Sequence, residues 1–156
     1  MYRNIFDTHA HYDDERFDED RAELLSSLFD GSVSGIINCG CDLKSSMKTV
    51  TLTDTHPFIY GAVGVHPHEA EEATVEDLEK IKDLYKNEKI VAVGEIGLDY
   101  FYDFSPRERQ IELFRQQIIT ANELGLPVII HDRDAHEDTM NILKELKPKG
   151  VVHCFS

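Results

Sequence analysis

The stretch "PVIIHDRD", residues 127–134, decides the fold. It opens with an apolar, β-branched run and then changes abruptly to a histidine, an arginine and carboxylates. Near-continuous apolar runs are typical of parallel strands that are buried on both faces. The stretch therefore predicts a buried strand that delivers chemical groups at its C-terminal end.

The same pattern recurs along the chain. Further strands are expected from Ile5 and Phe6 onward and in "GIINCG" (35–40), "FIYGAVGVHP" (58–67), "IVAVGEIGLDY" (90–100) and "GVVHCFS" (150–156). Apolar periodicity and capping residues predict helices between them, over 18–29, 74–86, 105–125 and 135–148. This alternation predicts βαβ units and a parallel sheet.

The helix over 105–125 has clear end signals. Ser105 is the expected N-cap, Pro106 would occupy the first helical position, and Glu108 would complete a capping box. Gly125 is the expected C-cap, because glycine readily adopts the left-handed conformation that ends many helices.

Two parallel architectures compete, an open doubly wound sheet and a closed barrel. Polar groups follow nearly every apolar run: His9 and His11, His66 and His68, Glu95 and Asp99, His131 and Arg133, and His153. An open sheet concentrates its ligand contacts at one switch point, whereas a barrel brings every strand's C-terminal end to one mouth. We therefore favour an α/β fold of the (β/α)₈ TIM-barrel type. Such barrels usually need about 250 residues, so residues 1–156 would form a single, incomplete barrel domain that reaches about the sixth strand.

Composition limits the possible classes of protein. No uninterrupted apolar run reaches the roughly 18 residues of a membrane span, and the N-terminus lacks the apolar region of a signal peptide, so we expect a cytoplasmic protein without membrane association. Three cysteines, an odd number, argue against a disulfide framework. Cys39 and Cys41 are interpreted as small strand-end residues rather than as a thiolate metal site. The oligomeric state stays open.

The formal net charge of −14 argues against loose electrostatic binding of nucleic acid, which depends mainly on basic patches. If nucleic acid is the substrate, something other than the field of the whole protein must hold it. Bound divalent cations would do so, because they reverse the local sign of a carboxylate-rich site.

"FDTHAHYD" (6–13) places His9 and His11 two residues apart, so both point to the same face of a strand. Asp7 has the same phase, and its carboxylate is expected to fix an imidazole tautomer. The histidines at the strand ends and Glu95 form a nitrogen-and-oxygen set suited to one or two divalent metals, with the carboxylate as a possible bridge. This set leaves the choice among Zn²⁺, Mn²⁺ and Mg²⁺ open.

Five motifs in order resemble the signatures of the TatD family of metal-dependent hydrolases, usually described as DNases within the amidohydrolase-like barrels. They are "IFDTHAHYD" (5–13), "GAVGVHPH" (61–68), "VGEIGLDY" (93–100), "PVIIHDRDAHED" (127–138) and "HCFS" (153–156). The resemblance implies that His9, His11 and Glu95 hold one metal, and that Glu95, His131 and His153 hold the second. It also implies one remaining metal ligand, an aspartate at the end of an eighth strand that is the candidate base for the attacking water. This aspartate is not among these residues. Tyr12 departs from the family, which commonly has an aliphatic residue there.

The expected function is that of a metal-dependent phosphodiesterase, an exonuclease-like deoxyribonuclease that acts on DNA or RNA through two divalent ions, with Glu95 as its catalytic bridge. His66, His68 and Arg133 are the predicted substrate contacts. The alternatives are loop packing beside Pro67 for the two histidines, and pairing with nearby aspartates for Arg133. Two rival functions stay open: hydrolysis of an amide, lactone or aminoacyl ester in the same barrel, and a truncated, inactive chain that binds metal.

Overall fold

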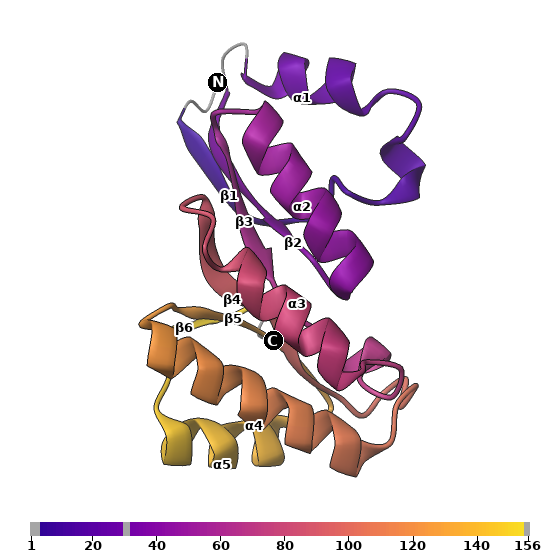
Figure 1. Cartoon of the computed structure of the whole chain (residues 1–156), viewed down its shortest axis with the longest axis vertical. Coiled ribbons are helices and arrows are strands. Elements are labelled where there is room, and N and C mark those ends of the chain that lie inside the picture. Colours follow the sequence, from indigo (N-terminus) through magenta and orange to yellow (C-terminus); the bar gives the residue numbers. More distant parts are fainter. Residues whose placement is uncertain (1–3, 30–31, 155–156) are drawn as a thin grey trace.

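The computed structural model describes residues 4–29 and 32–154, in which strands alternate with helices (Figure 1). The four predicted helices are present, together with a helix over Leu43–Thr55 that was not predicted. The elements in chain order are β1 (Ile5–Ala10), η1 (Glu15–Phe17), α1 (Arg21–Phe29), β2 (Val33–Cys39), α2 (Leu43–Thr55), β3 (Ile59–Val63), η2 (Pro67–Glu69), α3 (Val75–Leu84), β4 (Ile90–Asp99), α4 (Arg107–Leu124), β5 (Val128–Arg133), α5 (His136–Leu146) and β6 (Gly150–Val152). Phe155 and Ser156, the end of the last predicted strand segment, lie outside the described residues.

All six strands are parallel and pair in the order of the sequence, β1-β2-β3-β4-β5-β6. A doubly wound sheet would reverse its strand order at a switch point. The sequential order, with α2, α3, α4 and α5 along one side of the curled sheet in Figure 1, is instead that of a (β/α)₈ barrel through its sixth strand. The predicted fold class is confirmed.

The two faces of the sheet have different cores. On the helix side, Phe114 and Ile118 of α4 pack against Val93, Ile96 and Leu98 of β4. On the opposite, inner face, a small cluster consists of strand residues alone: Cys39, Ala62, Ala92 and Ile129, with Ile37 packed against them. Small side chains suit the confined inner side of a barrel, and the site residues continue this inner face toward the C-terminal ends of the strands.

Glu95 does not stand at the end of its strand, as the sequence pattern indicated, but in the middle of β4. The pairing of β4 with β5 shifts register between Val93 and Ile96, both of which pack on the helix side. The shift allows Ala92 and Glu95, three residues apart, to lie on the same inner face. A residue inserted into the pairing of a strand is a common device for redirecting a side chain near a functional site.

Two buried glutamines of α4 attach this helix to the loops that follow β3 and β4. The amide of Gln117 accepts from Val65 N (2.7 Å) and donates to Val65 O (3.0 Å). The amide of Gln110 accepts from Asp99 N (2.9 Å) and donates to the carbonyls of Asp99 (3.2 Å) and Ser105 (2.8 Å). Each glutamine therefore satisfies backbone groups at or just beyond the C-terminal end of a strand.

Several details of the predicted helices need correction. The Ser105 to Glu108 capping box does not form: Pro106 is the N-cap of α4 and has no side-chain cap, while the Ser105 hydroxyl is buried and donates to His68 O (2.9 Å). Gly125 ends α4 in the left-handed conformation, as predicted. The helix that was expected to begin at residue 18 begins at Arg21. The guanidinium of Arg21 donates to the backbone carbonyls of Tyr12 and Asp14, in the turn that precedes the helix.

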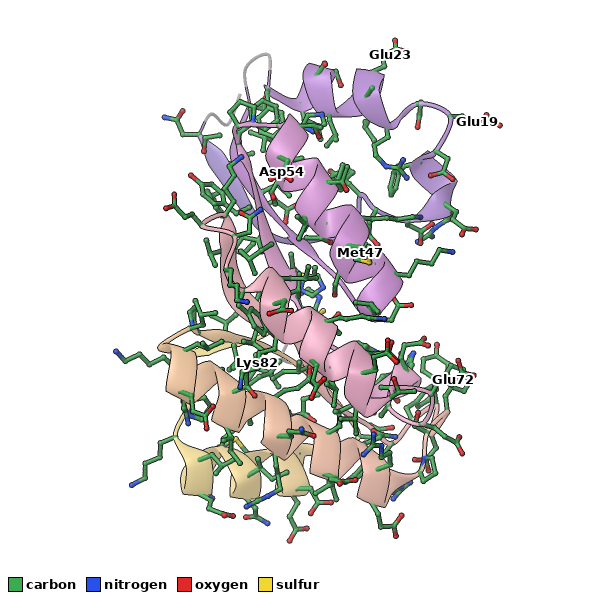
Figure 2. The ribbon with its side chains drawn as sticks, viewed as in Figure 1. Glu19, Glu23, Met47, Asp54, Glu72 and Lys82 are labelled. Atoms are coloured by element: carbon green, nitrogen blue, oxygen red, sulfur yellow. The ribbon has the colours of Figure 1, made fainter. Side chains whose placement is uncertain are left out.

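Acidic side chains such as Glu19, Glu23 and Glu72 stand at the periphery of the molecule (Figure 2). Within the described residues, no helix is both long enough and apolar enough to cross a membrane.

Gly97 offers a test of how closely β4 and β5 must approach. Its φ is +148°, and a Cβ at this position would overlap the carbonyl group of His131 in the neighbouring strand. Gly97→Ala should therefore lower the free energy of unfolding by about 3 kcal/mol, through backbone strain and overpacking together. The matched control is Gly125→Ala, where φ is +69° but no atom lies within 4 Å of the added Cβ; its cost should be about 1 kcal/mol. Urea unfolding of both variants measures the difference, and equal losses would contradict the close approach.

Candidate metal centre

The structure brings all of the sequence-predicted site residues to one cavity of about 580 Å³. These residues are His9, His11, His66, His68, Glu95, His131, Arg133 and His153. They come together because the strands are parallel and present their C-terminal ends on one side of the sheet. Asp99, Tyr102, Asp132 and Cys154 also line the cavity.

Glu95 lies at the centre of the imidazoles, with 5% of its side chain exposed. Its Oε2 is 3.3 Å from His9 Nε2, 3.7 Å from His11 Nε2 and 4.0 Å from His66 Nε2. Its Oε1 is 3.3 Å from His131 Nδ1. Burial opposes ionisation, but hydrogen bonds from His131 and His9 outweigh it and hold the pKa of Glu95 well below its usual range. The carboxylate is therefore charged and ready to accept a cation.

His9 and His11 point their Nε2 atoms at each other across 3.0 Å. His11 Nδ1 lies 2.8 Å from the carbonyl oxygen of Cys39, which can only accept, so Nδ1 carries the proton and Nε2 offers a lone pair. Only one proton fits between the two Nε2 atoms. The two Nε2 atoms and the Glu95 carboxylate therefore form a donor set that fits a divalent metal ion, which would replace this proton.

The sequence had indicated that Asp7 would fix an imidazole tautomer, but the tautomer of His11 is fixed by the carbonyl of Cys39. The Asp7 carboxylate instead accepts the backbone N–H of His9 (3.1 Å). Strand phase alone could not reveal this partner, because the carbonyl belongs to β2, the neighbouring strand.

His153, just after β6, stacks its ring on that of His9 with centroids 3.6 Å apart. Together with Glu95, these two histidines have ligand atoms within 4.8 Å of one another. A second such group consists of His11, Cys41 and Glu95. Burial and then the charge of Glu95 raise the pKa of the Cys41 thiol, so nitrogen and carboxylate oxygen are the better ligands in this group.

Asp99 supports two of the imidazoles. Its fully buried carboxylate accepts from His68 Nε2 (2.8 Å) and His131 Nε2 (3.0 Å), and from the backbone N–H groups of Phe101 (3.1 Å) and Tyr102 (2.8 Å). Burial raises its pKa, but these hydrogen bonds prevail and lower it to about 2. Asp99 therefore orients His68 and His131.

His131 lies between the two carboxylates, with Nδ1 toward Glu95 and Nε2 toward Asp99. Burial lowers its pKa, but the hydrogen bonds to Glu95 and Asp99 raise it above the usual value overall. With Nε2–H held by Asp99, the nitrogen that His131 could offer to a metal is Nδ1, on the Glu95 side.

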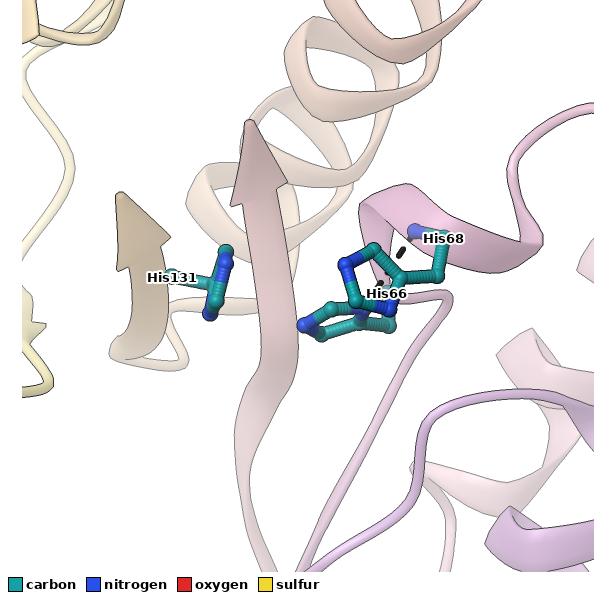
Figure 3. A group of neighbouring side chains, drawn as sticks. All are labelled: His66, His68 and His131. Atoms are coloured by element: carbon teal, nitrogen blue, oxygen red, sulfur yellow. Dashed lines mark hydrogen bonds between the residues drawn. The ribbon is translucent and has the colours of Figure 1, made fainter. Parts of the chain in front are cut away.

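His66 differs from the other histidines in its tautomer. Its Nδ1 accepts the backbone N–H of His68 (3.2 Å), the contact dashed in Figure 3, so its proton resides on Nε2. Burial lowers its pKa to about 3, which keeps the ring neutral. His66, His68 and His131 lie close enough together to hold an ion, but His66 presents a donor N–H to the cavity rather than a lone pair.

Arg133 does not pair with Asp132, Asp134 or Asp99, the alternative weighed from the sequence. Its guanidinium lies 4.0 Å from the ring centroid of Phe101 and 4.7 Å from that of Tyr102. Among the described residues it has no ion pair. Sequence reasoning did not find the aromatic partners, because the rings lie on a loop that the strand and helix patterns do not describe.

The chain is similar to known proteins over nearly its whole length. A family model described as "TatD related DNase" matches residues 6–156. A Bacillus subtilis protein described as the uncharacterized metal-dependent hydrolase YabD is 44% identical over 155 residues, which are 97% of this chain and 61% of that protein. The "3'-5' ssDNA/RNA exonuclease TatD" of Escherichia coli (strain K12) is 33% identical over 155 residues, which are 97% of this chain and 60% of that protein.

Solved structures agree with these matches. The TatD homologue YjjV of Escherichia coli superposes with a TM-score of 0.90 at 34% identity, over 97% of this chain and 60% of that one. A hydrolase of the TatD family from Entamoeba histolytica also gives a TM-score of 0.90, at 29% identity, over 100% of this chain and 60% of that one. The chain thus spans about 60% of the length of these relatives. It belongs to the family of TatD-related DNases, which are metal-dependent hydrolases.

Proposed function

We propose that this chain carries most of the metal centre of an exonuclease-like phosphodiesterase that acts on DNA, with RNA as a second candidate substrate. The observation that carries the proposal is the ionised, buried Glu95 at the meeting point of four imidazoles. The names of several relatives, "3'-5' ssDNA/RNA exonuclease TatD", support the substrate class.

We assign the ligands as the family resemblance implies. His9, His11 and Glu95 would hold one divalent ion, and Glu95, His131 and His153 the second. When bound, such ions supply Lewis acidity and lower the pKa of water, so that hydrolysis of a phosphodiester proceeds near neutral pH. The distances from both Glu95 oxygens to histidine nitrogens support its role as the shared ligand.

The remaining polar groups of the cavity suit a phosphate. His66 directs an Nε2–H into the cavity and is kept neutral by burial, so it is a hydrogen-bond donor. Arg133, at the end of β5, has its guanidinium over aromatic rings and no ion pair among the described residues, so its N–H groups can meet a phosphate. His68 is oriented by Asp99 through Nε2. We propose that these three residues contact the scissile phosphate.

Glu95→Ala tests the shared ligand. It should weaken binding at both sites by at least about 100-fold, since removal even of groups behind the ligands commonly costs 10- to 100-fold. His131→Ala should mainly impair one site. Calorimetric titration with Zn²⁺ or Mn²⁺ measures affinity and stoichiometry, with Glu23→Ala, an exposed carboxylate on α1, as the matched control. If Glu95→Ala leaves the stoichiometry and the affinity of metal binding unchanged, Glu95 does not bridge two ions.

The reaction itself is tested by incubating the metal-loaded protein with end-labelled DNA and RNA beside a panel of esters and amides. Cleavage of esters or amides alone would replace the proposed reaction with the rival one.

The affinity for single-stranded nucleic acid should also depend only weakly on salt concentration, because few phosphates contact side-chain cations in a chain of net charge −14. For one or two contacts on a single strand, log affinity should fall against log salt with a slope of about −0.7 to −1.4. A slope near −4, as for six contacts, would contradict short-range phosphate binding.

A further inference from the structure

The loop between β4 and α4, residues 100–106, holds three aromatic rings in solvent. Phe101 is 55% exposed, Tyr102 46% and Phe104 63%. The rings of Tyr102 and Phe104 stack with centroids 5.2 Å apart, and Phe101 meets Tyr102 edge to face. Neighbouring exposed rings of this kind are unusual on a protein surface and mark interaction sites. None of these rings is among the proposed metal ligands.

Hydrogen bonds to buried side chains fix the backbone at both ends of this loop. The Asp99 carboxylate accepts the backbone N–H groups of both Phe101 and Tyr102. The buried Ser105 hydroxyl donates to His68 O and accepts from Glu71 N (3.0 Å). Rings that are exposed but already ordered lose little conformational entropy when a ligand binds.

Arg133 completes the surface, since its guanidinium lies over the rings of Phe101 and Tyr102. Tyr102 and Arg133 also line the cavity that contains Glu95, so the rings are continuous with the metal centre. Among the described residues that line this cavity, Arg133 is the sole lysine or arginine. The Arg133 guanidinium beside aromatic rings suits a ligand that combines an anionic group with flat rings.

We propose that Phe101, Tyr102, Phe104 and Arg133, the aromatic platform, stack the unpaired bases next to the scissile phosphate of a single-stranded nucleic acid. This inference rests on the proposed function and adds to it the element that grips the substrate. Aromatic stacking tolerates any base sequence because every base has a π face. It also needs no positive field, which a chain of net charge −14 lacks.

The platform selects for single strands. In a duplex the faces of the bases are stacked on their neighbours and their edges are paired, so only splayed or terminal bases can reach aromatic side chains. The guanidinium of Arg133, which lies over the rings of Phe101 and Tyr102, would bind the adjoining scissile phosphate through its N–H groups.

The chain has no tryptophan, so Phe104→Trp introduces a single fluorescent reporter at the most exposed ring. In Mg²⁺, a deoxyadenosine trinucleotide with hydrolysis-resistant phosphorothioate linkages should quench this fluorescence saturably. The same backbone with abasic tetrahydrofuran in place of each base, and a blunt duplex, should quench it at least fivefold more weakly. Equal quenching by the abasic strand, or none by either strand, would overturn the platform.

Phe104→Ala provides a second measurement that does not depend on the reporter. Its affinity for the labelled trinucleotide, by anisotropy, should fall about five- to tenfold, since one stacked base contributes about that factor or more. Affinity for the abasic strand should change less than about twofold. Val75→Ala removes an apolar side chain that is 72% exposed on α3 and serves as the matched control, with no change expected. An equal loss for both strands would point to a structural effect and contradict stacking.

These outcomes separate the platform from the proposed function. Base-dependent quenching without metal-dependent cleavage by the unmodified chain would support the platform and count against the phosphodiesterase. Cleavage without base-dependent quenching would support the phosphodiesterase and contradict the aromatic platform. This outcome would be expected if the exposed rings bind a protein partner.

Discussion

Glu95 places a negative charge on the inner face of the sheet, where 5% of its side chain is exposed. A buried carboxylate costs several kcal/mol unless charges or hydrogen-bond donors surround it closely. The imidazoles of His9, His66 and His131 supply that surrounding from β1, from the loop after β3 and from β5. The site therefore requires the C-terminal ends of separate strands to meet at fixed positions, and the rest of the fold serves that requirement.

The scaffold achieves this precision through polar groups that lie behind the cavity. Gln117 and Gln110, two turns apart on one face of α4, bind the backbone at Val65 and Asp99. Asp99 in turn orients His68 and His131, and its other oxygen fixes the start of the aromatic loop. One helix thus positions both the imidazoles and the exposed rings. Loss of hydrogen-bonded support of this kind commonly lowers the affinity of a metal site 10- to 100-fold.

Much of this arrangement was predictable from the sequence. Runs such as "PVIIHDRD" contain both the strand and the groups at its end, so parallel topology and the convergence of the histidines followed from local patterns. Features that depend on contacts between distant segments could not be predicted from such local patterns. The helix α2 was not predicted, because it is rich in serine and threonine and has no clear apolar stripe. Ser105 was predicted to cap α4, but its hydroxyl instead donates to His68 O. The tautomer of His11 depends on a carbonyl of a neighbouring strand, which no spacing rule describes.

An acidic protein that handles a polyanion must hold it through short-range contacts. Here the proposed contacts are metal ions on Glu95 and its histidines, and stacking beside Arg133. The most direct test is a crystal structure of the chain soaked with Zn²⁺, with an anomalous difference map recorded at the zinc edge. If Glu95 is the shared ligand, peaks are expected at about 2.0 to 2.2 Å from its carboxylate oxygens, with His9 or His11 beside one peak and His131 beside another. Zinc bound elsewhere, with no peak within coordination distance of Glu95, would contradict this role.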